Sequence, residues 1–247
     1  MRSKAIKVAR PPRHGHNSAM NTVVTGASRG IGLEFARQLL MRGDAVHAAV
    51  RSPRGAPGLQ RLRESHPDAL HIHACDVSDD RSVRAFASSL GGEPVDVLIN
   101  NAGVSGKYRS LEELDADDVL QTFRTNALGA VLVTRALLPM LRQSKIPKVI
   151  HITSRMGAIA EASGGAYAYR MSKAALNMAA KNMAEDLRAD RIISVAVSPG
   201  WVQTDMGGRS APTPVEDSVR GMLQVIDGLS LEQSGTFLDF RGQRLPW

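Results

Sequence analysis

The sequence predicts an α/β protein with one doubly wound parallel sheet of about seven strands, flanked by helices. Two observations predict this class. Short β-branched runs alternate along the chain with segments whose apolar residues recur at helical spacing. Strands separated by helical segments indicate right-handed crossovers, which place helices on both faces of a parallel sheet. The length of 247 residues and the composition, 43% hydrophobic and 22% charged, suit one globular domain of this kind.

The first half of the chain supplies four of the strands. The β-branched run NTVVTG (21–26) ends in glycine, and the helical segment LEFARQLLMRG (33–43) ends at Gly43, a good C-terminal stop. The next strand, AVHAAV (45–50), runs into a Pro/Gly-rich loop. The remaining elements of this half are a strand at 70–77, a helix at 81–92 that ends in glycines, and a strand at 95–103 that runs into a turn.

The second half begins with a long helix from Ala116 to about Gln143. A Gly/Pro loop precedes its last helix. The elements after the long helix are, in order, strand 148–154, helix 168–187, strand 191–200, helix 215–229 and strand 235–240. Because no repeat, second domain or low-complexity region follows the N-terminal tail, we expect one domain over residues 20–247.

Residues 1–19 differ from the rest of the chain in charge. They carry five Lys or Arg and no Asp or Glu, so the net charge of +7 falls to +2 without them. The basic character therefore belongs to a tail and not to a domain face, which argues against a nucleic-acid binder. The tail lacks the apolar core of a secretory signal, although it weakly resembles a transit peptide. We expect a disordered extension ahead of a natural start at Met20.

Membrane insertion and disulfide bonding are both disfavoured. No run approaches the roughly 18 apolar residues of a membrane span. The single cysteine, Cys75, excludes an intrachain disulfide, so we expect a reducing compartment and a cytoplasmic protein. Cys75 itself is expected to pack as a small hydrophobe.

The segment TGASRGIG (25–32) follows the first strand and opens the first helix, which is the setting of a dinucleotide-binding loop. Gly26 permits the tight turn, Gly30 lets the backbone approach a pyrophosphate, and Gly32 lets the helix pack near the strand. The helix N-terminus then offers free N–H groups and a positive dipole to the phosphates. The spacing G-x-x-x-G-x-G differs from the common G-x-G-x-x-G.

Tyr169 and Lys173, four residues apart, are the candidate catalytic pair. On a helix they share a face, whereas Tyr167 lies about 120° around from the lysine. A carbonyl that receives a hydride needs an acid beside its oxygen. An ammonium about 4 Å from a phenol stabilises the phenolate by about 4 kcal/mol, or about three pKa units. We expect Tyr169 to be the acid/base, its pKa lowered by Lys173, and Tyr167 to line the substrate pocket or to pack.

The order of these and further motifs resembles that of the short-chain dehydrogenase/reductase family. From residue 20 to 247 the chain holds, in order, TGASRGIG, CDV (75–77), NNAG (100–103), TN (125–126), a serine in ITSRMG, Tyr-x-x-x-Lys, and PGWVQTDM (199–206). The stretches AYRMSKAALNM, PGWVQTDMGG and LPW are most similar to the sniffer-type carbonyl reductases and the C-factor-like proteins of that family. The resemblance implies a Rossmann-type sheet and a nicotinamide dinucleotide cofactor.

The resemblance also implies roles for single residues. Ser154 would hydrogen-bond the substrate oxygen as charge develops on it. Asn126 would bind a water that connects Lys173 to solvent, and Lys173 would also bind the nicotinamide ribose. In many members the serine lies 13 residues before the tyrosine, whereas Ser154 lies 15 before Tyr169. We interpret this as a two-residue insertion in the loop AIAEASGGA, since loops change length more easily than helices. Ser163 in that loop is an alternative hydroxyl.

Cofactor contacts carry over from the family onto matching positions. Asp76 resembles an aspartate that accepts from the adenine amino group, and the turn that starts at Asn100 resembles one under the ribose and nicotinamide. The segment from Pro199 resembles one that contacts the nicotinamide amide and the pyrophosphate. No metal is expected. The expected cofactor-binding residues are Gly26, Ser28, Arg29, Gly30, Ile31, Gly32, Arg51, Asp76, Val77, Asn100, Ala102, Gly103, Tyr169, Lys173, Pro199, Gly200, Val202 and Thr204.

The second strand predicts NADP(H) as the cofactor, with NAD(H) the less favoured. An NAD enzyme of this architecture carries Asp or Glu at the end of that strand, where it binds the ribose 2′-hydroxyl. Here Val50 occupies the position and Arg51 follows, while Arg29 can approach from the other side. Guanidinium groups suit a 2′-phosphate because their forked donors match its oxygens.

We therefore expect an NADPH-dependent oxidoreductase that reduces a ketone, aldehyde or quinone carbonyl, with Tyr169 as proton donor. The alternative is a C-factor-like signalling or regulatory protein of the same fold that binds NAD(P) without depending on turnover. The intact Ser-Tyr-Lys set favours the enzyme. The expected partner is a small carbonyl or alcohol substrate, without nucleic acid or membrane. A homodimer through the long helices is a further expectation, although Met171, Met178 and Met183 could equally be core.

Overall fold

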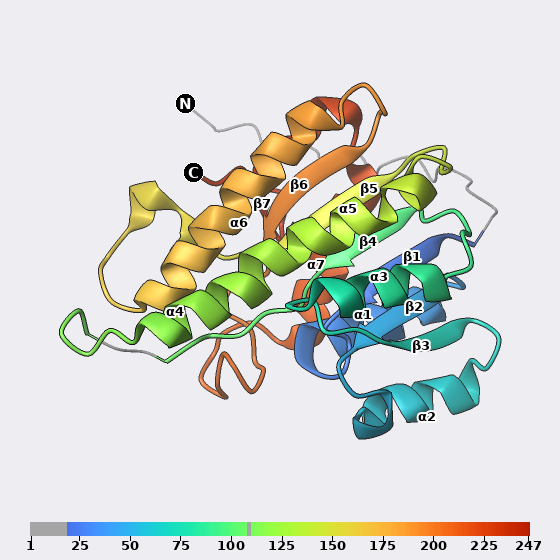
Figure 1. The fold of residues 1–247 in the computed structure, drawn as a ribbon, viewed down its shortest axis with the longest axis horizontal. Helices are drawn as coiled ribbons and strands as arrows, with labels where there is room; N and C mark the ends of the chain where they lie inside the picture. Colours follow the sequence, from blue (N-terminus) through green and yellow to red (C-terminus); the bar gives the residue numbers. More distant parts are fainter. Residues whose placement is uncertain (1–18, 108–109) are drawn as a thin grey trace, which may run out of the picture.

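The computed structural model describes residues 19–107 and 110–247 and holds one seven-stranded sheet (Figure 1). All neighbouring strands run parallel, in the order β3-β2-β1-β4-β5-β6-β7, so the expected doubly wound sheet is confirmed. Apart from residue 19, the expected N-terminal extension lies outside the described residues. The strands are β1 Asn21–Thr25, β2 Ala45–Val50, β3 Leu70–Ala74, β4 Val97–Asn100, β5 Lys148–Ile152, β6 Ile193–Ser198 and β7 Phe237–Asp239.

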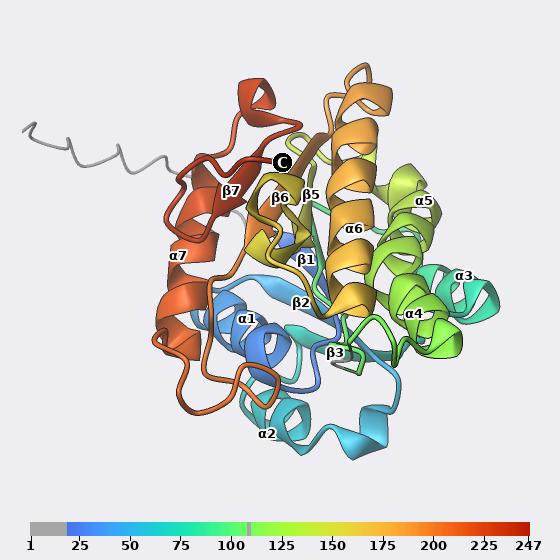
Figure 2. The ribbon, with the colours of Figure 1, turned by 90° about the vertical axis from the view of Figure 1, so that its left-hand side faces the viewer.

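Helices cover both faces of the sheet (Figure 2). One side carries α1 and α7, and the other carries α3, α4, α5 and α6. None of the described helices is long and apolar enough to cross a membrane. The helices are α1 Gly30–Met41, α2 Pro57–Ser65, α3 Asp80–Ser89, α4 Ala116–Phe123, α5 Gly129–Leu141, α6 Tyr167–Asp186 and α7 Val215–Gly228.

Two apolar clusters fill the two faces of the sheet. Phe35 of α1 and Met222 of α7 pack with Val24 on one face. Phe86 of α3 packs with Val23 on the other. Because successive strand residues point to opposite faces, a strand covered on both sides must be apolar throughout, which explains the continuous apolar runs.

The structure adds a helix that the sequence patterns did not indicate. Pro57 and Gly58 suggest a loop, yet they begin α2. Proline suits the first turn of a helix, where its missing N–H leaves no hydrogen bond unmade. A Cβ on Gly58 would lie 2.6 Å from a methyl of Leu33, so the glycine lets α2 approach α1.

The long helix expected from Ala116 to Gln143 is divided into three parts. A π-helical stretch, Arg124–Leu128, separates α4 from α5. Such stretches widen one turn of a helix and are frequent at functional sites. Asn126 lies in this stretch and is buried.

Candidate active site

The glycine loop joins β1 to α1 at the carboxyl edge of the sheet, where ligands bind in this architecture. Gly26 has φ +65°, and a Cβ there would lie 2.7 Å from the Cα of Ala102. A Cβ on Gly32 would collide with the carbonyl oxygen of Gly26. The first turn of α1 therefore packs directly on the loop, which requires glycine at both positions.

Gly30 has more space around it than Gly26 and Gly32. A Cβ added there would lie 3.4 Å from the nearest atom, the methyl of Thr204. The N-cap residue, Arg29, makes no side-chain cap bond to α1. Ser28 and Ile31 lie half-buried beside it. Uncapped N–H groups at an open helix N-terminus suit a phosphate. The residues present therefore fit a dinucleotide pyrophosphate.

The turn after β4 is tied to the glycine loop by Asn101, a residue that the sequence analysis missed. Its side chain donates to the carbonyl oxygens of Thr25 and Gly26, at 2.9 and 3.2 Å. The Thr25 hydroxyl accepts from the N–H groups of Asn101 and Ala102. The only signal in the sequence is the place of Asn101 within NNAG.

Asn100 faces the interior and not the cofactor side of the turn. Its amide nitrogen donates to Thr134 at 3.0 Å and lies 3.5 Å from Nδ1 of His151. Its side-chain oxygen is buried without a hydrogen-bond partner among the described residues. The side chain of Asn100 therefore supports the sheet, and the expected contact of Asn100 with the cofactor stays a prediction.

Ser154, Tyr169 and Lys173 meet where β5 ends. The Ser154 side chain accepts from the N–H of Met156 at 3.1 Å and hydrogen-bonds the Tyr169 phenol. Nζ of Lys173 lies 5.7 Å from the centre of the Tyr169 ring and donates to the carbonyl oxygen of Ile152 at 2.8 Å. The spacing of four residues thus places phenol and ammonium on one face of α6.

Burial dominates the electrostatics of this cluster. It raises the pKa of Tyr169, and the hydrogen bond with Ser154 opposes this rise. It also lowers the pKa of Lys173 to about 8. The net pKa of Tyr169 is thus raised and not lowered, because burial outweighs the opposing effects on the phenol. Nζ of Lys173 is hydrogen-bonded to the end of β5, and the expected lowering of the Tyr169 pKa by Lys173 stays a prediction. The phenol is protonated at neutral pH, which is the form that donates a proton.

Short turns absorb the unusual spacing between Ser154 and Tyr169. Two 3₁₀ turns, Arg155–Gly157 and Ile159–Glu161, follow the serine. Gly164, Gly165 and Ala166 then have φ of +78°, +64° and +48°, and this left-handed run returns the chain to α6. The alternative hydroxyl, Ser163, accepts instead from Arg170 at 2.7 Å in an exposed contact.

Tyr167 and Asn126 border the cluster without joining it. Tyr167 lines a small surface pocket with Lys107 and Asp118. The Asn126 side chain exchanges hydrogen bonds of 2.8 Å with both main-chain polar groups of Val104. A Cβ on Gly103 would lie 3.3 Å from Oδ1 of Asn126 and 3.6 Å from Nζ of Lys173. Gly103 therefore lies between the two side chains, and the water-binding role of Asn126 stays a prediction.

The expected adenine side of the site contains Asp76 and Arg51. Asp76 accepts from the N–H and hydroxyl of Ser78, at 2.9 and 2.7 Å. These bonds, together with the nearby charge of Arg51, lower the pKa of Asp76. Val77 is buried, and a Cβ on Gly129 would lie 2.9 Å from its side chain. Arg51, exposed at the end of β2, therefore lies close enough to Asp76 for its charge to act on that carboxylate.

The segment after β6 forms a loop over the start of α1. The Pro199 carbonyl accepts from the Ser218 hydroxyl at 2.7 Å, and Val202 pairs with Thr213. Gly200 has φ +83° and would clash with Phe240 if it carried a side chain. Residues 199–214 contain no helix, so the loop reaches α7 without a helical lid.

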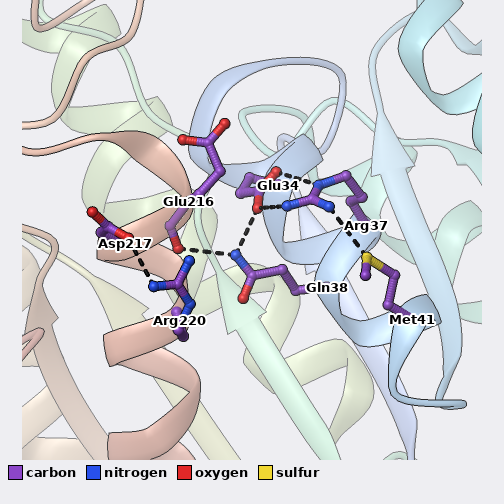
Figure 3. Close-up of polar contacts among 7 residues, drawn as sticks. All are labelled: Glu34, Arg37, Gln38, Met41, Glu216, Asp217 and Arg220. Atoms are coloured by element: carbon purple, nitrogen blue, oxygen red, sulfur yellow. Dashed lines mark hydrogen bonds and ion pairs between the residues drawn. The ribbon is translucent and has the colours of Figure 1, made fainter.

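Polar contacts join α1 to α7 (Figure 3). Glu34, buried in α1, accepts from Arg37 at 2.7 Å and from Gln38 at 2.6 Å. The same Gln38 nitrogen donates to the carbonyl oxygen of Glu216 in α7, at 3.0 Å. The helix that follows the glycine loop and the helix that follows the 199–214 loop are thus held together.

Comparisons with known proteins agree with this geometry. The family model for short chain dehydrogenases matches residues 20–214. The C-signal protein of Myxococcus xanthus is 57% identical over 166 residues, which cover 67% of this chain and all of that protein. The NADPH-bound carbonyl reductase from chicken fatty liver superposes with a TM-score of 0.88 at 36% identity, over 93% of this chain and 99% of that one.

The carbonyl reductase Sniffer of D. melanogaster also superposes with a TM-score of 0.88, at 31% identity over 93% of this chain and 100% of that one. The similarity to the sniffer-type and C-factor-like members, expected from the motifs, is thus confirmed. The matching family model spans most of the chain. The chain therefore belongs to the short-chain dehydrogenase family of oxidoreductases.

Proposed function

We propose that the protein is an NADPH-dependent carbonyl reductase that acts on a ketone, aldehyde or quinone. The observation that carries the proposal is the meeting of Ser154, Tyr169 and Lys173 beside the turn that is tied to the glycine loop. Solved carbonyl reductases similar to this chain include proteins with NADPH or NADP bound, which supports the cofactor and the reaction class.

Each residue of the cluster has one task in the reduction. NADPH, when bound, supplies the hydride. The Ser154 hydroxyl orients the substrate oxygen, and Tyr169 donates its phenolic proton as negative charge develops there. Because burial raises its pKa, the phenol keeps this proton until the substrate oxygen takes it. The Lys173 ammonium, 5.7 Å from the ring centre, then stabilises the phenolate by about 3 kcal/mol at an effective dielectric of about 20.

Preference for NADPH over NADH would come from Arg51 and Arg29, with no acidic residue at Val50 to repel a 2′-phosphate. Each arginine has an aspartate nearby, however: Asp76 for Arg51 and Asp205 for Arg29. A charge-assisted hydrogen bond contributes about 1.5–3 kcal/mol, and an exposed ion pair that must be given up costs about 0.2–1 kcal/mol. We therefore expect a preference of about tenfold for each arginine.

The test is NADPH oxidation over a panel of ketones, aldehydes and quinones, with Tyr169→Phe as the inactive reference. For the best substrate, kcat/KM is then measured with NADPH and with NADH, for wild type and for Arg51→Ala. We expect NADPH to be preferred, and the preference to fall in Arg51→Ala. Equal efficiency with both cofactors, or an Arg51→Ala variant that keeps the full preference, contradicts the cofactor assignment.

A second function, signalling without dependence on turnover, is favoured by the 57% identity to the C-signal protein. Such a role requires the fold and the cofactor site but not a proton donor. Tyr169→Phe separates the two, because it removes one hydroxyl and leaves the cofactor loop untouched. An inactive Tyr169→Phe variant that retains a biological effect would support the signalling role.

Assembly as a homodimer is proposed on the apolar outer faces of α4 and α6, which lie side by side in Figures 1 and 2. Leu120 is 61% exposed and Met178 is 61% exposed, whereas Met183 packs against the core. Exposed apolar patches of this kind mark interaction sites. A wild-type monomer in sedimentation at micromolar concentration would contradict the dimer. A cytoplasmic location is also proposed, supported by the free, buried Cys75.

A further inference from the structure

An ion pair connects the two loops that border the glycine-loop site. Arg29, in the glycine loop, contacts Asp205, in the loop after β6, with 3.0 Å between NH1 and Oδ2. The two residues are 176 positions apart in the chain. Both side chains are about three-quarters exposed, 75% and 76%, so the pair lies where a solute can reach it.

The position of Asp205 is set by the backbone before and after it. The neighbouring Thr204 points its methyl at Gly30, 3.4 Å from where a Cβ would lie. The hydroxyl of Thr204 accepts from the N–H of Gly207 at 3.1 Å, and its carbonyl oxygen accepts from Gly208 at 2.8 Å. The turn that carries Asp205 therefore rests on the first turn of α1, and its carboxylate is held close to Arg29.

This arrangement places a negative charge where the proposed function requires a positive one. Asp76 lies near Arg51, and Asp205 pairs with Arg29, so the charge of each arginine is opposed by an aspartate. Attraction of a phosphate to either arginine is weakened accordingly. The carboxylate and a 2′-phosphate are anions that use the same guanidinium donors.

We propose that Asp205 is a specificity-determining residue that competes with the 2′-phosphate of NADP(H) for Arg29. The proposal rests on the NADP(H) preference proposed above. Asp205 lowers the affinity for 2′-phosphorylated adenosines, because the 2′-phosphate must displace its carboxylate from Arg29. Cofactors without a 2′-phosphate leave the ion pair in place.

The size of the effect follows from the exposure of the pair. Exposed ion pairs contribute about 0.2–1 kcal/mol, which corresponds to about 1.5- to 5-fold in a dissociation constant. We therefore expect Asp205→Asn to tighten binding of a 2′-phosphorylated adenosine by this factor. Salt screens exposed charges, so the gain should shrink as the ionic strength rises from about 0.05 M to 0.5 M.

The test is calorimetric titration of the full chain with adenosine 2′,5′-bisphosphate and with 5′-AMP, which lacks the 2′-phosphate. The variants are Asp205→Asn, Arg29→Ala and the double variant. Asp217→Asn is the matched control, because Asp217 is an exposed aspartate paired with Arg220 at 2.8 Å on α7 (Figure 3). It removes the same charge without touching Arg29.

Asp205→Asn should tighten binding of the bisphosphate and leave binding of 5′-AMP unchanged. Asp217→Asn should change the affinity for neither nucleotide. The tighter binding should vanish when Arg29→Ala is also present. Weaker or unchanged bisphosphate binding in Asp205→Asn, or a gain that persists without Arg29, overturns the competition. If wild type binds both probes equally and Arg29→Ala changes neither, the NADP(H) preference falls as well. If wild type prefers the bisphosphate through Arg29 and Asp205→Asn gives no gain, only the competition falls.

Discussion

Replacement of Lys173 by methionine should stabilise the fold at neutral pH while it stops carbonyl reduction. The lysine is 4% exposed, and burial lowers its pKa from 10.5 to about 8. At 1.36 kcal/mol per pKa unit, holding the ammonium inside costs about 3 kcal/mol at pH 7. The hydrogen bond from the ammonium to the carbonyl oxygen of Ile152 offsets about 1.5–3 kcal/mol of this cost. The net gain of Lys173→Met is therefore about 1 kcal/mol, or roughly 2–4 °C in Tm for a chain of this size.

The stability difference between Lys173→Met and wild type should depend on pH in a defined direction. Between pH 8 and 10.5 the unfolded chain still binds the proton that folded Lys173 has released, so wild type gains stability as the pH rises. The advantage of Lys173→Met should shrink over the same range. Calorimetric melting at pH 7, 8.5 and 10 measures this change. Lys181→Met is the control, since the side chain of Lys181 is 45% exposed and pairs with Glu185 on the same helix. A Lys173→Met variant that melts below wild type at pH 7, or a Tm difference from wild type that does not change with pH, would refute the reasoning.

The remaining predictions concern the same helix, the turn before it and strand β2. Tyr169→Phe should abolish turnover and leave cofactor binding nearly intact, whereas Tyr167→Phe should keep most of the turnover; steady-state kinetics showing the reverse would reject the pairing on α6. Gly157→Ala should lower kcat and cost about 1–3 kcal/mol in urea denaturation, because its Cβ would lie 2.7 Å from the backbone of Lys173. An unchanged denaturation midpoint would contradict this. Burial and two neighbouring histidines lower the pKa of His47 to about 4, so wild type should lose stability as the pH falls from 6.5 toward 4. His47→Gln should remove up to about 3 kcal/mol of this loss, and an equally acid-sensitive variant would count against it.

The sequence predicts best what is decided within one element. The shared face of Tyr169 and Lys173 follows from helical geometry, and the glycine loop is recognised because strand, turn and helix follow one another. Contacts between segments that are distant in the sequence cannot be predicted in this way. The pairing of Arg29 with Asp205 depends on how a loop 176 residues away rests on α1, and no local pattern encodes it.

The degree to which a side chain is buried also cannot be predicted from local sequence patterns. The shift of the Tyr169 pKa depends on how much water the completed fold removes from the phenol, and burial outweighs the opposing hydrogen bond with Ser154. The different roles of Asn100 and Asn101 have a similar origin, because adjacent residues at the end of β4 face opposite sides of the sheet. Helix α2 was missed because Pro57 and Gly58 are typical of loops, and only the closeness of Leu33 explains the glycine.

The left-handed run at 164–166 has a consequence for how this enzyme family can change. Ser154 and Tyr169 are fixed by a strand end and a helix, while the segment 155–166 can vary in length as long as the chain turns back before Tyr167. The positions of the two side chains and the length of the segment between them can therefore change independently. Loops of other lengths could be grafted between Gly157 and Ala166 without moving the helix that carries Tyr169.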